Sequence, residues 1–373
     1  MRDFTTSNLA NTCGATNRPT RVAFVLASNS RSPLPSTRIA VLNMLPFLGA
    51  AGFEPEIVFE PEQPNMSPIV DGLEHRLVAE GFGIVFLQKV RGPSVERLAR
   101  RLAEHGIATV FGVCDLVTPA MVECTDATVA VTDYLKALYP LQLQPRIHVV
   151  HDGIENPFVR KLAYGAARGS RGNPLRAVLV TSSRLSELPV IGTPPEWLDV
   201  TIVGPYWRTD TPLRRLSEAG QHWREQPTSR RLHRLRFLMS QRIRRVPWHP
   251  GRVYEFMEVA DVGIIPVEPS MDAAEEPVPT WQVKSENRLT MKMSVGLPVV
   301  ASPVPAYTPV IEPGGFNGYI ARTRRDWLDH LGELRDPARR KQVGRRARAA
   351  VLERYSMKEQ ARRLVAVLDS VSA

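Results

Sequence analysis

The sequence predicts an α/β protein made of two doubly wound parallel sheets with a cleft between them. Short apolar runs alternate with helix-forming segments through most of the chain, as in parallel sheets covered on both faces. This alternation is interrupted once, at residues 164–174, by a stretch rich in Gly, Ala, Arg and Ser. The length of 373 residues suits two domains. Because doubly wound sheets bind ligands beyond the carboxyl ends of their strands, a ligand site is expected in the cleft.

The first domain is predicted over residues 21–165, after a polar, Ser/Thr/Asn-rich segment (residues 1–20) that is expected to be a disordered tail. Two helices are predicted, at 39–48 and 94–105. Six apolar runs are predicted to be its strands, at residues 21–28, 56–59, 83–88, 108–113, 128–131 and 147–150.

The second domain is predicted over residues 166–355, where the same alternation resumes. A closing segment, 356–373, carries apolar residues at helical spacing. It is expected to form a helix that packs back on the first domain. Five strands are predicted in the second domain, at residues 177–181, 200–203, 245–247, 262–265 and 299–301.

Charge and cysteine usage narrow the class of protein. The net charge is +10, concentrated in 208–245 and 322–363, which favours anionic partners. No apolar run reaches the roughly 18 residues that a membrane-spanning helix needs. The three cysteines have no metal-ligand spacing and their odd number favours reduced thiols, so we expect a cytoplasmic protein. They are Cys13, Cys114 and Cys124.

The segment 284–303 is the most informative part of the chain. Ser285 is predicted to cap a helix that ends at Gly296. Lys284 and Arg288 place positive charge at the start of this helix, where a cation is unfavourable unless an anion is bound. The chain has no Walker loop and no Gly-x-Gly-x-x-Gly fingerprint after its first strand. The helix start is therefore predicted to bind a diphosphate.

This segment resembles the donor-binding signature of the retaining family-4 glycosyltransferases, which have the GT-B fold of two facing Rossmann-like domains. The segments 259–267 and 149–158 resemble two further stretches of that family. The family's paired glutamates are replaced here by Val283 and Met291. The signature residues that match are Met293, Gly296, Pro298, Val299, Val300 and Ala301.

The resemblance implies a donor site at the start of this helix. Diphosphate oxygens would meet the guanidinium groups and the backbone N–H groups after Ser285. Met291 would give the nucleoside an apolar contact, and Glu286 is the nearest partner for the ribose. The implied donor-binding residues are Arg38, Arg184, Lys284, Ser285, Glu286, Asn287, Arg288 and Met291. Two carboxylates are the candidate catalytic groups, Asp115 toward the acceptor and Glu268 toward the sugar.

The function implied is a cytoplasmic glycosyltransferase of polysaccharide biosynthesis. It would move a sugar from a nucleotide sugar to a glycan or lipid-linked acceptor, with retention at the anomeric carbon. The donor is a substrate, and no metal or further cofactor is expected. The arginine-rich segment 208–245 could contact an anionic membrane, whereas no nucleic-acid partner is expected. Two alternatives stay open: a nucleotide-sugar epimerase of the same fold, and a non-catalytic sugar-nucleotide binding protein.

Overall fold

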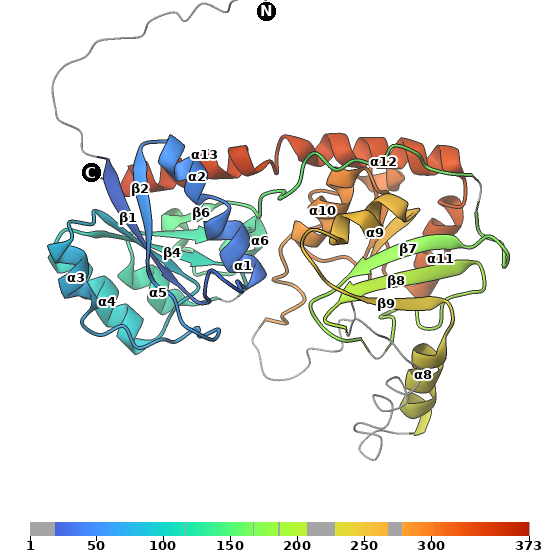
Figure 1. The fold of residues 1–373 in the computed structure, drawn as a ribbon, viewed down its shortest axis with the longest axis horizontal. Helices are drawn as coiled ribbons and strands as arrows, with labels where there is room; N and C mark the ends of the chain where they lie inside the picture. Colours follow the sequence, from blue (N-terminus) through green and yellow to red (C-terminus); the bar gives the residue numbers. More distant parts are fainter. Residues whose placement is uncertain are drawn as a thin grey trace, which may run out of the picture.

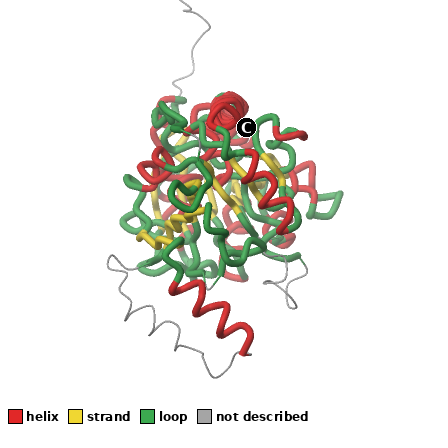
Figure 2. The backbone as a smooth tube through the Cα atoms, turned by 90° about the vertical axis from the view of Figure 1, so that its right-hand side faces the viewer, coloured by secondary structure: helices red, strands yellow, loops and turns green. Residues whose placement is uncertain are grey.

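The computed structural model describes residues 19–115, 117–166, 168–185, 187–206, 228–267 and 278–372, without the side chains of 228–233. These residues form two six-stranded parallel sheets that lie side by side (Figure 1). Helices cover both faces of the strands, and α8 extends away from the body (Figure 2). The predicted two-sheet α/β fold class is confirmed. The predicted tail lies, up to residue 18, outside the described residues.

The first sheet has the strand order β2-β1-β3-β4-β5-β6. Its central strands are apolar and inaccessible to solvent, as expected for strands covered on both faces. The strands are β1 (Thr20–Leu26), β2 (Phe53–Phe59), β3 (Ile84–Gln88), β4 (Ala108–Val113), β5 (Ala127–Ala130) and β6 (Ile147–Val149). The helices that follow them are α3 (Leu73–Ala79), α4 (Pro93–Glu104), α5 (Pro119–Cys124), α6 (Asp133–Ala137) and a 3₁₀ turn at Gln144–Arg146.

The helix predicted at 39–48 is three short pieces. These are α1 (Pro35–Thr37), a π-helical turn at Arg38–Leu42 and α2 (Leu45–Ala50). Pro46 has no backbone N–H and would clash with the preceding turn inside a helix. It is tolerated only in a first turn, so a new helix begins beside it.

The second sheet has the strand order β12-β11-β10-β7-β8-β9. Only β12 was not predicted, because its two residues carry no readable periodicity. The strands are β7 (Leu175–Val180), β8 (Leu198–Gly204), β9 (Ile243–Pro247), β10 (Val262–Ile265), β11 (Val299–Ala301) and β12 (Tyr319–Ile320). The helices are α8 (Thr228–Met239), α9 (Val253–Val259), α10 (Asn287–Val295), α11 (Arg324–Glu333), α12 (Pro337–Leu352) and α13 (Met357–Val371), with a 3₁₀ turn at Pro313–Gly315.

The last helix returns to the first sheet. α12 runs along the second domain, and α13 continues it across the first (Figure 1). Leu364, Val367 and Leu368 of α13 are buried in one apolar cluster with residues of β1, β3 and α2. Ser356 caps α13 by accepting a hydrogen bond from the N–H of Glu359 at 3.1 Å. The chain terminus thus supplies part of the first domain's core. Among the described helices, none is long and apolar enough to cross a bilayer.

Candidate functional site

The start of α10 lies at the junction of the two domains. Its N-cap residue is Glu286, which makes no side-chain capping bond, so the prediction that Ser285 caps the helix is wrong. The Ser285 hydroxyl instead donates to Asp152 Oδ2 of the other domain at 2.6 Å. Gly296 ends the helix in the left-handed conformation, as predicted (φ 86°). Because no side chain caps α10, its first backbone N–H groups do not donate to a capping side chain. They can donate to an acceptor outside the helix instead.

Arg288 brings the start of α10 to the carboxyl end of β7. Its Nη2 donates to Ser182 Oγ at 3.0 Å. Arg184 follows two residues later and is exposed, with Nε donating to the carbonyl of Pro205 at 2.9 Å. Lys284, three residues before the first residue of α10, is exposed. Arg288 and the loop that carries Arg184 are therefore brought together, as the diphosphate prediction requires. No ligand contact is tested by this geometry, so the donor-binding roles stay predictions.

Met291 and Lys292, one turn after Arg288, face the core of the second domain. Asn287 and Met291 are half-buried, and Met291 packs against the apolar cluster under α9. Lys292, which sequence reasoning missed, is inaccessible to solvent, and its Nζ donates to the carbonyl of Arg288 at 3.1 Å. Burial, with a smaller contribution from the Arg288 charge, lowers the pKa of Lys292 to about 7.

A glycine in β10 makes room for this lysine. A Cβ on Gly263 would lie 2.7 Å from Lys292 Cδ, closer than carbon atoms pack. A side chain at this position would clash with the methylene groups of Lys292 and displace them from the surface of β10. The glycine within an otherwise apolar strand was the sequence signal for this close approach.

Residues 278–286, which we name the strap, cross to the first domain. Val283 is buried in that domain's core cluster, and Gln282 Oε1 accepts a hydrogen bond from the Tyr134 hydroxyl at 2.7 Å. Together with the Ser285–Asp152 bond, these contacts fasten the carboxyl edge of one sheet to that of the other. Val283 was predicted only as a departure from the family's glutamate. Its apolar side chain here serves interdomain packing.

Glu286 is buried against a histidine of the first domain. Its Oε1 lies 2.6 Å from His151 Nδ1, and the exposed fractions of the two side chains are 2% and 5%. The same nitrogen lies 3.1 Å from the Val131 carbonyl. Among the described residues, neither carboxylate oxygen has a hydrogen bond of good geometry. The predicted ribose contact of Glu286 stays a prediction, while in this structure its carboxylate faces His151.

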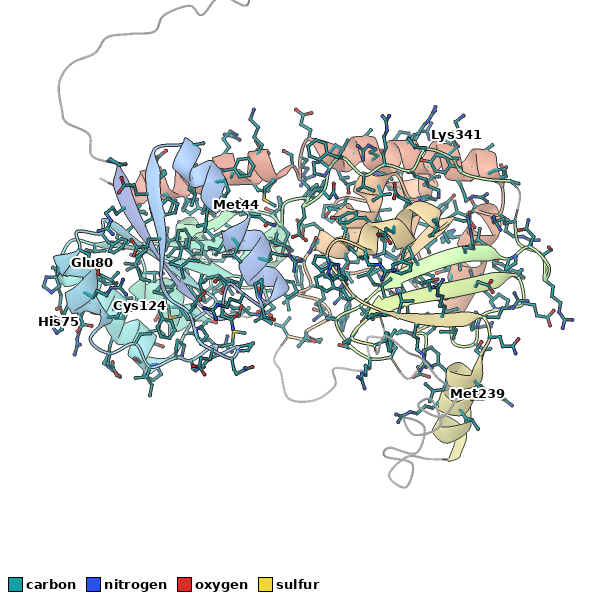
Figure 3. All side chains as sticks on the ribbon, viewed as in Figure 1. Met44, His75, Glu80, Cys124, Met239 and Lys341 are labelled. Atoms are coloured by element: carbon teal, nitrogen blue, oxygen red, sulfur yellow. The ribbon has the colours of Figure 1, made fainter. Side chains whose placement is uncertain are left out.

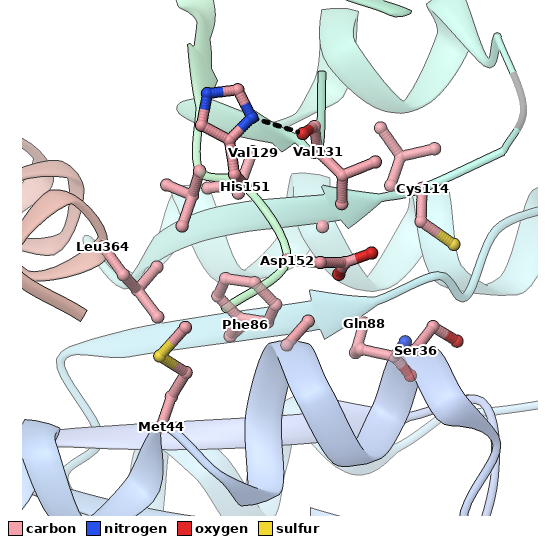
Figure 4. A pocket seen from close by; sticks show the side chains of 14 residues that line it. Ser36, Met44, Phe86, Gln88, Cys114, Val129, Val131, His151, Asp152 and Leu364 are labelled. Carbon is pink, nitrogen blue, oxygen red and sulfur yellow. Dashed lines mark hydrogen bonds between the residues drawn. The ribbon is translucent and has the colours of Figure 1, made fainter. Parts of the chain in front are cut away.

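A small, mostly apolar pocket with a few polar groups opens at the carboxyl edge of the first sheet, with a volume of about 30 Å³. Figure 4 shows the Asp152 carboxylate between Cys114 on one side and Gln88 with Ser36 on the other. Gln88 Oε1 accepts from the N–H of Ala27 and the hydroxyl of Thr37. Those two donors fix the orientation of the amide, so its NH₂ group is left for the pocket. Apolar side chains form the remaining wall.

The titration behaviour of the pocket follows from burial. Desolvation raises the pKa of Asp152 to about 6; the Glu286 and Glu155 charges add to the effect, and the Ser285 hydrogen bond opposes it. Desolvation, with the Asp115 charge second, raises the pKa of Cys114 to about 12. Near neutral pH, Asp152 is therefore largely ionised and can accept a hydroxyl proton, whereas Cys114 stays a thiol.

Of the two predicted catalytic carboxylates, Asp115 lies at this edge and Glu268 lies outside the described residues. Asp115 Oδ2 is paired with the ammonium group of Lys89, and its Oδ1 has no partner among the described groups. Lys89 has a left-handed backbone (φ 62°), which is strained for a residue with a side chain. Lys89 directly follows β3 and Asp115 lies two residues after β4, so the ion pair joins the ends of two neighbouring strands.

Arg38 binds Glu155, which lies at the start of the linker between the two domains. Its guanidinium binds Glu155 with two bonds, of 2.7 and 3.0 Å, and Asn43 adds a third bond to the same carboxylate. The Arg38 guanidinium carbon also lies 5.2 Å from the ring centre of Trp248 in the second domain. Its predicted contact with phosphate stays a prediction. In this structure Arg38 joins the first loop to the linker and to the other domain.

Comparison with known proteins identifies the fold. Neither a protein-family model nor a curated protein sequence matches the chain. Anabaena HepE, solved in complex with UDP and glucose, is 13% identical at a TM-score of 0.59, covering 94% of this chain and 100% of its own. Sucrose-phosphate synthase from Thermosynechococcus elongatus is 12% identical at a TM-score of 0.65, covering 94% and 99%.

A protein from Listeria monocytogenes, provisionally named a UDP-N-acetylglucosamine 2-epimerase, is also similar. It is 12% identical at a TM-score of 0.53, covering 94% of this chain and 96% of its own. At these identities the likeness shows the GT-B fold and nothing finer. It extends over almost the whole length of each protein.

Proposed function

We propose that this protein is a glycosyltransferase that moves a sugar from a nucleotide sugar to an acceptor hydroxyl. The observation that carries the proposal is that the carboxyl ends of the strands of the two sheets lie next to each other at the domain junction. On one side is the start of α10 with Arg288, and on the other is a pocket with Asp152, Gln88 and Ser36. A site with anion-binding groups facing hydroxyl-binding groups fits a diphosphate donor and an alcohol acceptor. HepE, of the same fold, was solved with UDP and glucose, which supports the donor class.

The donor diphosphate would lie on the N–H groups at the start of α10. Arg288, Lys284 and Arg184 would neutralise its charge, and Arg288 would exchange its bond to Ser182 for one to phosphate. A charge-assisted hydrogen bond of this kind contributes about 1.5–3 kcal/mol. The nucleoside would contact Met291. No cofactor beyond the donor is part of the proposal.

The acceptor hydroxyl would take the place that the Ser285 hydroxyl now occupies on Asp152. The acceptor oxygen forms a bond to the anomeric carbon as the bond from that carbon to the leaving diphosphate breaks. The acceptor proton passes to a carboxylate at this edge, Asp152 or Asp115, or to the departing phosphate oxygen. We propose retention at the anomeric carbon and a glycan or lipid-linked acceptor, following the resemblance of segment 284–303 to the retaining family.

One other enzyme class fits the same fold. A nucleotide-sugar epimerase would bind the same donor and return it with one centre inverted, and the Listeria protein carries such a name. A non-catalytic binding protein is the other alternative, because Val283 and Met291 replace the family's acidic pair.

Incubation of the purified protein with UDP- and GDP-sugars, followed by mass spectrometry, separates these three functions. A transferase releases the nucleoside diphosphate and produces a glycosylated acceptor or free sugar, and NMR of the product gives its anomeric configuration. An isomerised donor would identify an epimerase. Binding without turnover of any donor, with every acceptor offered, would refute the transferase proposal.

A further inference from the structure

The linker that joins the two sheets, residues 155–166, has a face that points away from the protein. Alternate side chains hold it to the second domain: Val159 packs into an apolar cluster, and Lys161 donates to two carbonyls at the end of α9. The residues on the opposite face are solvated. Phe158 is 90% exposed and Leu162 is 81% exposed. The backbone is thus fixed while two large apolar side chains are presented to solvent.

Cations flank these two side chains. Arg160 lies between them in sequence and is exposed. The linker runs beside α12 (Figure 1), where Arg348 donates to the carbonyls of residues 157 and 159 at 2.9 and 3.1 Å. Lys341 and Arg345 are exposed one turn apart on the same helix. Figure 3 shows Lys341 projecting outward from α12.

The nearby acidic groups offset only part of this charge. Asp261 is buried and paired with Arg168 and Arg176. Glu258, at the end of α9, is exposed, and its carbonyl accepts the hydrogen bond from Lys161 on the inner face of the linker. Single exposed hydrophobic residues are ordinary on protein surfaces. Two large apolar side chains on a fixed backbone, with a cation between them, instead combine the apolar and electrostatic attractions by which proteins bind anionic lipid surfaces.

We propose that this linker surface, formed by Phe158, Arg160, Leu162, Lys341 and Arg345, docks on an anionic phospholipid bilayer. The aromatic and aliphatic side chains would enter the boundary between headgroups and acyl chains. The cations would bind lipid phosphates, for which their charge is complementary. This surface shares no residue with the arginine-rich segment 208–245, of which residues 208–227 lie outside the described part of the chain, and the proposal does not depend on transferase activity.

Sedimentation of the full-length protein with vesicles tests the proposal. Vesicles of phosphatidylcholine alone are compared with vesicles that also contain phosphatidylglycerol. The protein should bind the anionic vesicles at low salt and be released at high salt, because salt screens the phosphate contacts. The double variant F158S/L162S should bind at least about tenfold more weakly, since it loses the inserted apolar groups. Charge reversal in R160E/K341E should weaken binding by a similar factor.

Matched variants make the outcome decisive. Ile69 and Leu141 are 82% and 81% exposed on the first domain and are not among the residues of this surface, so I69S/L141S should keep wild-type binding. R236E alters an exposed arginine of α8 and should also keep it. The proposal is overturned if wild-type protein binds neutral and anionic vesicles equally or binds neither. It is also overturned if F158S/L162S binds as wild type while R236E does not, which would assign the contact to α8.

Discussion

Replacement of Lys292 by methionine is expected to stabilise the protein, most strongly below pH 7. Lys292 is inaccessible to solvent, and the hydrogen bond it makes is to a helix carbonyl. Burial lowers its pKa from the ordinary 10.5 to about 7. At about 1.4 kcal/mol per pH unit, the cost of keeping the buried ammonium charged is about 5 kcal/mol. Methionine has a similar length and flexibility and carries no charge, so it removes this cost.

The sign of the pH dependence follows from proton binding. Between pH 7 and 10.5 the unfolded chain binds the lysine proton and the folded protein does not, so wild-type stability rises with pH in that window. This gain in wild-type stability is lost as the pH falls from 10.5 to 7. Below pH 7 both states bind the proton, so the stability no longer changes with the titration of this lysine. The advantage of Lys292→Met should therefore be about 5 kcal/mol at pH 6 and smaller by about 3 kcal/mol at pH 9.

Urea unfolding of both proteins at pH 6 and pH 9 measures this difference. Lys341→Met is the matched control, because Lys341 is an exposed lysine in the same domain and its replacement should change stability by less than about 0.5 kcal/mol at either pH. If Lys292→Met destabilised the protein equally at both pH values, the lysine would have to be charged and favourably paired, and the reasoning would be refuted.

Three further predictions concern the site and the domain junction. Arg288→Ala should weaken binding of UDP or GDP by about tenfold or more in calorimetry; unchanged affinity would remove the main support for the donor site. In a transferase assay, the wild-type rate should fall below about pH 6, where Asp152 becomes protonated. Asp152→Asn should abolish that pH dependence. A variant that keeps the wild-type pH profile would exclude Asp152 as the proton acceptor. Arg340 is buried and donates to four different backbone carbonyls. Arg340→Lys has fewer donors and should lower the free energy of unfolding, measured in urea, by about 2–4 kcal/mol. An unchanged free energy of unfolding would mean that these bonds do not hold the linker.

Periodicity predicted most of the strands because both sheets are buried on both faces. The strands β4, β10 and β11 have the predicted bounds, since an apolar run between polar loops leaves little freedom. Helix starts were predicted less well. A Ser before an apolar run normally caps the helix, but Ser285 found a stronger acceptor, the Asp152 carboxylate, in the other domain. No local pattern could reveal a partner that is 133 residues away.

The sequence by itself determined the two-sheet architecture and the cationic helix start, because the strands follow from the spacing of apolar runs and Lys284 and Arg288 are neighbours of the helix start in the chain. Only the tertiary structure decided which groups meet. It buried Glu286 against His151, paired Arg38 with Glu155 and placed Lys292 under β10 without solvent. These contacts depend on how strand ends and loops converge at one edge. The free energy of a buried charge is set by that three-dimensional surrounding and not by its neighbours in the chain.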